Sequence, residues 1–357
     1  MIRAMGHVRQ FAPDDIPAIV ALRRKTFRHS ERPSAEDLGV YLEQIFFRNP
    51  WCNEGIPSLV YRNATGEIVG FMGVVPRPAT FQNRPIRIAV GTQLMVDPAA
   101  RGLVGVALVK AFLSGPQDLS FADLANDVSR RLWEALGGTV SLVQSLQWTQ
   151  PLRPGRFYAG RVARRLHARA LAWGLRPVSW AVDGLTARWP LARGLQEAPL
   201  TPALMAAHVP DLLDHLTLRP RYDEGSLRWL LDQLAATTKR GELHGVAVRG
   251  ADGSVVGWYL YYANAGGVGQ VVQVVARYGQ GDDVLQSLFH HAWEQGLVAL
   301  QGRLEPGLMS ALGTGGALLA REGPWVLAQA QRPELSAAIH RGDAFLSRLD
   351  GEWWMSF

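Results

Sequence analysis

The pattern of apolar positions is most informative in residues 88–113, which read IAVGTQLMVDPAARGLVGVALVKAFL. An apolar strand is predicted up to Val96, and an amphipathic helix is predicted over residues 104–113. A glycine-containing turn joins them. The first backbone N–H groups of such a helix have no internal acceptor and lie at the positive end of the helix dipole. The turn is therefore a candidate anion site of the kind that binds phosphate.

The neighbouring segments place this turn in a longer series of elements. Residues 58–61 and 68–75 are rich in β-forming residues, and the turn between them carries Gly66. Residues 119–124 predict a short strand, and residues 126–129 open a helix over 130–136 that Gly137 and Gly138 end. A further helix is predicted from about residue 12 to residue 28. The predicted order is helix, three strands, helix, strand, helix.

Residues 96–107 resemble the acyl-CoA-binding motif of the GNAT (GCN5-related N-acetyltransferase) superfamily. The resemblance lies in Val96-Asp97-Pro98, followed by Arg101-Gly102 and Gly105-Val106-Ala107. Counting from Arg101, the usual Gln/Arg-x-x-Gly-x-Gly/Ala pattern places Val104 and Val106 at its two small-residue positions, and one deleted residue would bring Gly105 and Ala107 into register. The order of elements over about residues 1–150 is similar to that of the superfamily. This resemblance implies an α/β (α+β) fold with a mixed, mostly antiparallel sheet flanked by helices.

The second half of the chain repeats these patterns at an offset of about 180 to 187 residues. Gly66–Phe71 matches Gly253–Trp258, strand 89–96 matches strand 270–276, and helix 104–113 matches helix 284–293. A steady offset favours tandem domains. We therefore predict an N-terminal GNAT domain (1–152), a basic helical connector (153–197) and a C-terminal degenerate GNAT-like domain (198–357). Asp282 and Asp283 would repel a pyrophosphate, so only the N-terminal domain is expected to bind acyl-CoA.

The resemblance implies acyl transfer from acetyl-CoA or another acyl-CoA to an amine, by direct attack on the thioester. A backbone N–H of the strand before the turn would polarise the thioester carbonyl, and the turn would hold the pyrophosphate. The residues implied for binding are Leu94, Met95, Val96, Arg101, Gly102, Leu103, Val104, Gly105, Val106, Ala107, Asn126 and Ser129.

The groups that move protons are less directly indicated. Asp123 and Asn126 end the strand that follows the turn and are the first candidates for positioning the acceptor. Many family members place a tyrosine on the next helix as proton donor, where this chain has Trp133, so Tyr158 is the alternative donor. Ser129 also fits a helix-capping role. The aromatic tail, residues 351–357, is predicted to be a packed strand.

The connector concentrates the positive charge of the chain. Residues 151–200 contain nine arginines and two acids, a net charge of +7, whereas the net charge of the whole chain is +6. Three interpretations are open: helices packed on both domains, an interfacial helix on anionic lipid through residues 153–193, or an acidic macromolecular partner. Nucleic acid is the least favoured, because the segment lacks the regular basic and aromatic interleaving of a base-stacking groove.

Composition limits the remaining choices. With 48% hydrophobic and 19% charged residues the chain is predicted to be folded. One cysteine excludes an intrachain disulfide, and neither a signal peptide nor a bilayer-spanning run is recognisable. The expected location is the cytoplasm or, peripherally, the inner face of the membrane. No metal site is predicted: His290 and His291 are adjacent on one helix, which is poor ligand spacing.

The sequence thus predicts an acyl-CoA-dependent N-acyltransferase acting on a small-molecule amine or a lipid-linked or carrier-linked one. Two alternatives stay open. One is a catalytically silent GNAT-like binding or scaffold protein, docked on a membrane through the connector. The other is an aminoacyl-tRNA-dependent transferase resembling the peptidoglycan-bridge enzymes, which also pair two GNAT-like domains.

Overall fold

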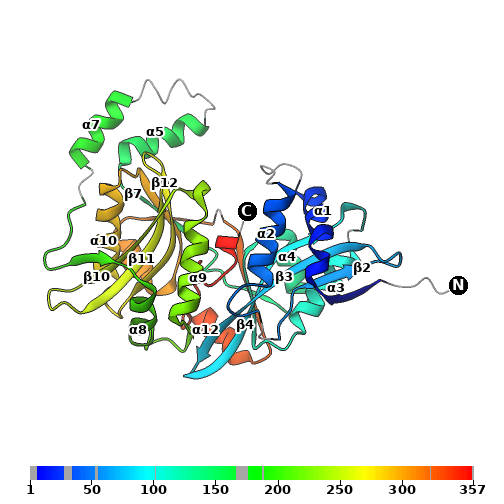
Figure 1. Ribbon diagram of the computed structural model, residues 1–357. Coiled ribbons are helices and arrows are strands. Elements are labelled where there is room, and N and C mark those ends of the chain that lie inside the picture. Colours follow the sequence, from blue (N-terminus) through cyan, green and yellow to red (C-terminus); the bar gives the residue numbers. More distant parts are fainter. Residues whose placement is uncertain are drawn as a thin grey trace.

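The protein forms two mixed β-sheets with helices packed against them (Figure 1). The computed structural model describes residues 6–27, 34–52, 55–100, 102–165, 176–186, 189–321 and 323–355. Both sheets are mostly antiparallel, and each contains one parallel pair of strands at its centre. The predicted fold class, two tandem sheets flanked by helices, is confirmed.

The first sheet has the strand order β1-β2-β3-β4-β5-β15-β6, and β9 pairs with the far end of β3. The strands are β1 (His7–Gln10), β2 (Leu59–Arg62), β3 (Ile68–Phe81), β4 (Arg84–Val96), β5 (Leu119–Ala125), β6 (Thr139–Val140), β9 (Leu218–Pro220) and β15 (Trp325–Ala330).

The second sheet has the order β14-β7-β13-β12-β11-β10-β8. The strands are β7 (Gln147–Pro151), β8 (Gln196–Pro199), β10 (Glu242–Arg249), β11 (Val255–Ala263), β12 (Val268–Ala276), β13 (Ala299–Arg303) and β14 (Leu318–Ala320). Every residue of β11 is buried, as expected for a central strand covered on both faces.

The helices alternate with the strands along both halves. They are α1 (Ile16–Thr26), α2 (Ala35–Phe46), α3 (Leu103–Leu113), α4 (Asp127–Ala135), α5 (Pro154–Arg165), α7 (Arg176–Thr186), α8 (Pro202–Leu212), α9 (Glu224–Ala235), α10 (Gly281–Glu294), α11 (Met309–Thr314) and α12 (Pro333–Arg341). Among the described residues, no helix is both long and apolar enough to span a bilayer.

Local sequence accounts for the elements that frame the first sheet. In α2 the Ser34 hydroxyl caps the helix by accepting the Asp37 N–H at 3.0 Å, and Leu38, Leu42 and Ile45 recur at helical spacing on the buried face. The Asn126 side chain caps α4 in the same way, accepting the Ser129 N–H at 2.9 Å. These caps set where each helix leaves the sheet.

The two halves of the chain exchange strands. β7 follows β6 in sequence but lies in the second sheet between β14 and β13, and β15 returns from the second half to lie between β5 and β6. One apolar core accordingly contains residues from both halves, from Phe11 and Phe71 to Trp258 and Trp354. The predicted domain limits at residues 152 and 198 stay a prediction, but sheet membership crosses the first limit in both directions.

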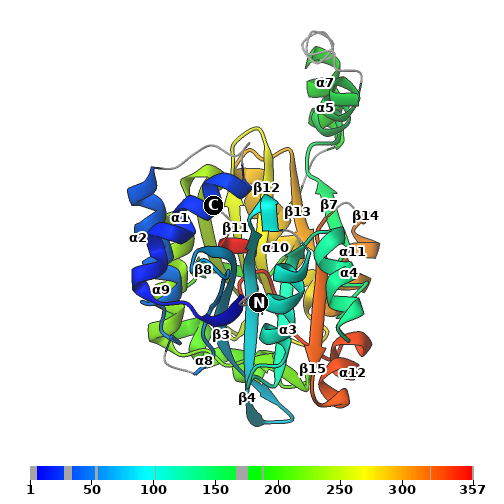
Figure 2. The same ribbon diagram turned by 90° about the vertical axis from the view of Figure 1, so that its right-hand side faces the viewer.

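In the part of the connector that the structure describes, the helices α5 and α7 project beyond the body of the molecule at one end of the second sheet (Figures 1 and 2). They pack on each other where Gly155 meets Ser179 and Asp183, and Phe157 anchors α5 on Val298. Residues 166–175, including Arg169 and Trp173, lie outside the described residues.

The strand exchange predicts that residues 1–152 cannot fold alone. This fragment would lack β9 and β15, leaving the buried Leu119 and Phe121 of β5 at an open sheet edge, and its β7 would have no partner. We expect no cooperative thermal unfolding by circular dichroism. Co-expression with residues 153–357 should restore a soluble complex. A sharp unfolding transition of the fragment alone would contradict the exchange.

Candidate active site

The central parallel strands of the first sheet separate, and this opens a cavity between them. β4 and β5 pair only where Ile88–Val90 lies beside Leu119–Phe121, although both strands continue further. Beyond that point a cavity of about 300 Å³ lies between them. Its walls are Arg23, Phe27, Met72, Gly91, Thr92, Gln93, Leu94, Ala122, Leu124, Ala125, Asn126, Ser129, Trp133, Glu352 and Met355.

A β-bulge shapes the β4 wall of this cavity. Phe71 pairs with Met95 and Gly73 with Thr92, so that Gln93 and Leu94 together lie opposite the single residue Met72. Gln93 adopts a left-handed conformation with φ 50°. Its side chain donates to the Tyr41 hydroxyl at 2.8 Å, which fixes the bulge against α2. Bulges of this kind redirect backbone groups away from the ladder, and here the redirected residues line the cavity.

The turn after β4 leads directly into α3. Gly102 precedes the helix with φ 108°, a conformation that strains any other residue. Gly102 at the N-cap has no side chain that could accept the first N–H groups of the helix, and Leu103 in the first turn is 83% exposed. The N-terminal N–H groups of a helix can donate to an anion, so the anion site stays a prediction for this turn. Arg101 lies outside the described residues.

A carboxylate from the far end of the chain, Glu352, bridges the two separated strands. Its Oε1 accepts the Leu124 N–H of β5 at 3.0 Å, and the Thr92 hydroxyl of β4 donates to the same carboxyl group. Burial, reinforced by the nearby charge of Asp123, raises the pKa of Glu352 to about 8. A carboxyl group that changes charge near neutral pH and lines a cavity is suited to general acid–base chemistry.

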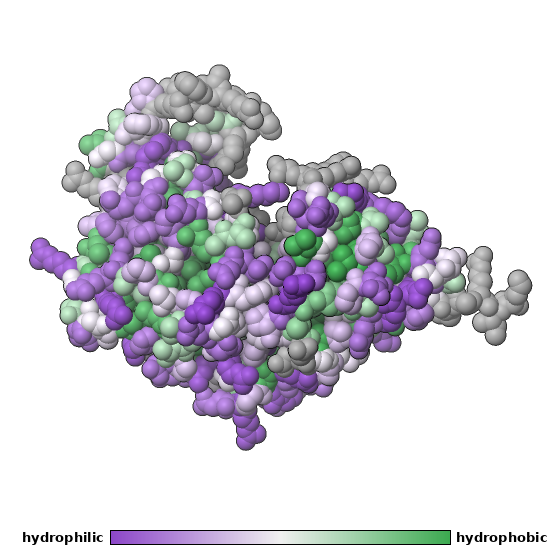
Figure 3. Space-filling model, viewed as in Figure 1, coloured by the Kyte–Doolittle hydropathy of each residue, from purple (hydrophilic) through white to green (hydrophobic). Residues whose placement is uncertain are grey.

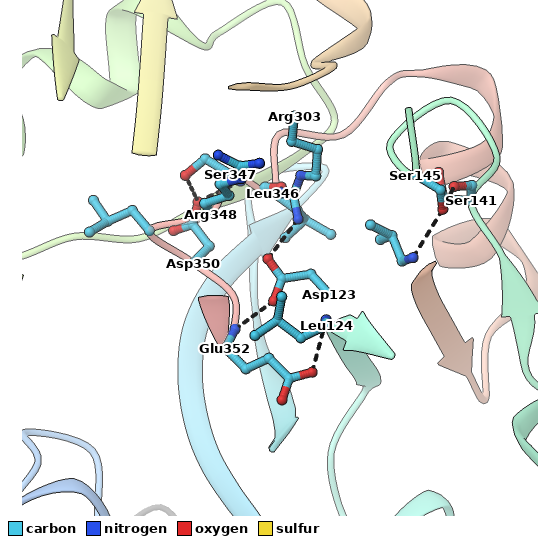
Figure 4. Close-up of polar contacts among 12 residues, drawn as sticks. Asp123, Leu124, Ser141, Ser145, Arg303, Leu346, Ser347, Arg348, Asp350 and Glu352 are labelled. Atoms are coloured by element: carbon cyan, nitrogen blue, oxygen red, sulfur yellow. Dashed lines mark hydrogen bonds and ion pairs between the residues drawn. The ribbon is translucent and has the colours of Figure 1, made fainter. Parts of the chain in front are cut away.

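Asp123 and Arg303 hold the segment that carries Glu352. Arg303 Nη1 donates to Asp123 Oδ2 at 2.7 Å, and the Glu352 N–H donates to Asp123 Oδ1 at 2.7 Å (Figure 4). Arg303 also donates to the Leu346 carbonyl. At Gly351 an added Cβ would lie 2.3 Å from the Asp123 carboxyl group, so glycine permits the close approach. Burial raises the pKa of Asp123, and Arg303 opposes that shift.

The structure brings some of the predicted site residues together and separates others. Leu94, Asn126 and Ser129 line the cavity, whereas the Met95 side chain is buried in the core and Val96 ends β4 beside α3. Gly102 is the N-cap of α3, and Leu103, Val104, Gly105, Val106 and Ala107 form its first turns. Asp123 is fully buried behind the cavity wall, in the ion pair with Arg303. Tyr158 lies on α5, half exposed, away from the residues that line the cavity.

Sequence reasoning missed Glu352 and Arg303. The tail was predicted to be a strand, but Trp353–Met355 forms a buried 3₁₀ turn that places Met355 and Glu352 at the cavity. The one available signal was a single acid within an otherwise apolar and aromatic run, since such an acid is buried and therefore partnered. No group of ligands able to hold a metal ion occurs among the described residues.

The second sheet repeats this architecture at a constant offset. Val268 pairs with Ala299 as Ile88 pairs with Leu119, an offset of 180 residues for both strands, and a bulge recurs opposite Leu260 and Tyr261. The buried ion-paired residues Asp123 and Arg303 are therefore equivalent positions in the two copies.

The second copy keeps an open cleft with a different lining. A cavity of about 610 Å³ lies beside the end of β12 and the segment that follows β13, where Glu305 takes the place of Ala125. The first turn of α10 carries Asp282 and Asp283, as predicted, where α3 has neutral residues. Carboxylates at a helix N-terminus oppose phosphate binding.

Comparison with solved structures identifies the architecture. A probable N-acyltransferase of unknown function from Enterococcus faecalis V583 superposes with a TM-score of 0.59 at 13% identity, over 92% of this chain and 73% of that chain. A GCN5-related N-acetyltransferase from Anabaena variabilis gives 0.57 at 12% identity, over 90% and 72%. This chain has the GNAT fold in tandem.

The tandem GNAT arrangement also superposes on Saccharomyces cerevisiae N-myristoyltransferase, whose structure contains myristoyl-CoA. The TM-score is 0.52 at 10% identity, over 96% of this chain and 86% of that chain. The sequence itself matches no protein-family model and no curated protein. The GNAT resemblance predicted from residues 88–113 is thus confirmed at the level of fold.

Proposed function

We propose that the protein is an acyl-CoA-dependent N-acyltransferase whose active site is the cavity between β4 and β5. The observation that carries this proposal is the buried Glu352 carboxyl group, which lies between the separated strands and beside the Gln93 bulge. A site for acyl transfer needs an anion-binding turn, a backbone donor for the carbonyl and a base for the amine. Leu94 and Glu352 line this cavity, and the first turn of α3 follows β4, the strand that forms one of its walls.

Each group has a proposed role. The N–H groups at the start of α3, over residues 102–107, would bind the pyrophosphate of acetyl-CoA or another acyl-CoA. The backbone of Leu94 at the bulge would polarise the thioester carbonyl, and Asn126 would position the acceptor at the opposite wall. Asp123 is assigned a positioning role, because its carboxyl group touches Arg303 and the Glu352 backbone and is shielded from the cavity.

The proposed reaction proceeds by direct attack. The protonated amine gives a proton to the Glu352 carboxylate, and its nitrogen bonds to the thioester carbonyl carbon. The carbon–sulfur bond then breaks, and the nitrogen loses its second proton, which passes through water to the leaving thiolate, since Tyr158 lies on α5 and outside the cavity wall. Glu352 afterwards releases its proton to solvent. The products are an amide and the free thiol of CoA.

The acceptor is proposed to be a primary amine of a small molecule, or of a lipid-linked or carrier-linked one. We propose that the protein binds this acceptor in the cytoplasm or at the inner face of the membrane, which agrees with a CoA-dependent reaction. Apolar side chains of Phe27, Leu94 and Met355 at the cavity would accommodate carbon chains beside the reacting group.

Charge reversal at the start of α3 tests the proposal. Leu103→Glu adds a carboxylate at an 83% exposed position of the first turn. The carboxylate would repel the pyrophosphate and would itself interact with the positive end of the helix dipole. We expect the affinity for acetyl-CoA, measured by isothermal titration calorimetry, to fall at least about tenfold, which corresponds to about 1.4 kcal/mol.

The matched control is Leu103→Gln, which has nearly the same size and no charge and should bind like the wild type. Absence of acetyl-CoA and longer acyl-CoA binding by the wild type would refute the proposed function. Release of free thiol in the presence of a panel of primary amines then separates an enzyme from a silent binding protein.

A further inference from the structure

The helix α7 has an inverted distribution of side chains. Its buried residues are polar: Ser179 and Asp183, one helical turn apart, face α5. Its exposed residues are apolar, including Val178 (63% exposed) and Leu185 (85% exposed). A helix on the surface of a water-soluble protein ordinarily shows the opposite pattern. The outer face of α7 therefore fits a medium less polar than water.

The adjacent helix α5 extends this apolar surface. Phe157 and Ala163 point inward, while Tyr158 and Val162, at i and i+4, are exposed. Of the sixteen large apolar residues that are exposed in the described part of the chain, six lie on α5 and α7: Tyr158, Val162, Val178, Trp180, Val182 and Leu185. Figure 3 shows apolar residues on the outer surface of this projecting part, beside hydrophilic ones. Trp180 lines a cavity beside Trp189 and Trp293, and we call the other five residues the hairpin surface.

The charge around the hairpin surface is strongly positive. Residues 153–193 contain nine arginines and a single acid, Asp183. The Asp183 carboxylate is turned inward and is 7% exposed, because Oδ1 accepts the Gly155 N–H and Oδ2 accepts Arg156 Nε, each at 2.7 Å. Asp183 thus presents no negative charge outward. Of the connector arginines whose side chains the structure describes, Arg161 and Arg193 are exposed, whereas Arg153 donates to backbone carbonyls and Arg156 pairs with Asp183. Exposed apolar side chains in a segment of net positive charge are the combination that binds the boundary of an anionic bilayer.

We propose that the hairpin surface docks the protein on an anionic lipid membrane. A second copy of the chain is disfavoured as occupant, because two surfaces of the same positive charge would be brought together. Apolar side chains of α7 would enter the headgroup and acyl boundary, while arginines of the connector would pair with lipid phosphates. This inference is independent of the proposed acyl transfer, since it concerns a surface remote from the β4–β5 cavity.

Co-sedimentation of the full chain with lipid vesicles tests the proposal. We expect binding to phosphatidylcholine vesicles that contain phosphatidylglycerol, weaker binding at higher salt, and little binding to pure phosphatidylcholine. The double variant Val182→Glu/Leu185→Glu should lower the partition coefficient at least about tenfold, because it removes apolar area and adds repulsive charge.

Leu142→Glu is the matched control, since Leu142 is 66% exposed on the loop between β6 and β7. It should bind vesicles like the wild type, and all variants should keep the wild-type melting temperature within a few degrees. Equal binding to neutral and anionic vesicles, or binding to neither, would overturn the proposal. So would an α7-dependent dimer in sedimentation velocity, or RNA binding that the α7 variant abolishes while vesicles fail to compete.

Discussion

Glu352→Gln is expected to lower kcat for acyl transfer by about 10²–10⁴-fold, the usual contribution of a positioned general base. Glutamine preserves the shape of the side chain and can still accept the Leu124 N–H, but it cannot take a proton from the amine. The affinity for acyl-CoA should stay within about twofold, because the first turn of α3 is unchanged. Stopped-flow or steady-state detection of the released thiol measures the rate.

The pH dependence gives this variant a second readout. The active form of a base is the deprotonated one, and the pKa of Glu352 is raised to about 8. For the wild type, kcat should therefore rise with pH through about 8, and the Gln variant should lose that rise. A purely structural role for Glu352 would lower the rate without removing the pH dependence.

The matched control for this experiment is a variant of a buried glutamate in the second copy, Glu305→Gln. Glu305 is also buried, its pKa is raised by burial to about 7, and it lines the cavity beside the end of β12. Glu305→Gln should leave kcat and its pH profile as in the wild type. Equal losses in the two variants would argue against the assignment of the active site to the first copy.

Asp123→Ala is expected to destabilise the folded protein by about 3–5 kcal/mol, because it leaves the buried Arg303 guanidinium with only the more distant Glu305 carboxylate, 3.5 Å away. The same change removes the acceptor of the Glu352 N–H, so the C-terminal segment loses its anchor. Urea unfolding followed by tryptophan fluorescence measures the free energy of unfolding. Activity measured well below the unfolding midpoint should fall as well.

The double variant Asp123→Leu/Arg303→Met distinguishes the cost of leaving the Arg303 charge buried without Asp123 from the cost of losing the contact between the two side chains. Removing both charges should recover part of the lost stability, since a buried pair replaced by apolar residues is often nearly neutral, although the buried Glu305 loses its contact with Arg303. The exposed pair Glu224–Arg228, one turn apart on α9, serves as control, and Glu224→Ala should cost less than about 1 kcal/mol. A small effect of Asp123→Ala would contradict the assigned positioning role.

The predictions that the structure confirms are based on short-range patterns in the sequence. The apolar strand, the glycine turn and the helix over residues 103–113 lie together in sequence, so propensity and periodicity suffice to find them. The repeat also survives in sequence, because the paired central strands keep an offset of 180 residues. The pattern within each copy is local, so the repeat is found by comparing two short segments of sequence and needs no knowledge of contacts between them.

The contacts between residues far apart in the chain could not be predicted from the sequence, and the reason is physical. Glu352 meets Leu124 across 228 residues, and β15 pairs with β5 across a similar separation. Nothing in the local pattern at residues 351–355 distinguishes a packed strand from a 3₁₀ turn, since both bury the same tryptophans. Likewise, Tyr158 was a reasonable proton donor by composition, but helix α5 turns away with the connector.

The exchanged strands also bear on how the chain is made. Residues of the first sheet leave the ribosome in order from β1 to β6, yet the strand between β5 and β6 is β15, which begins at residue 325. Until then the nascent chain exposes the apolar edge of β5, and final sheet closure awaits distant contacts that form slowly. Folding of both halves should consequently finish only after most of the chain has been synthesised, with chaperones shielding that edge in the meantime.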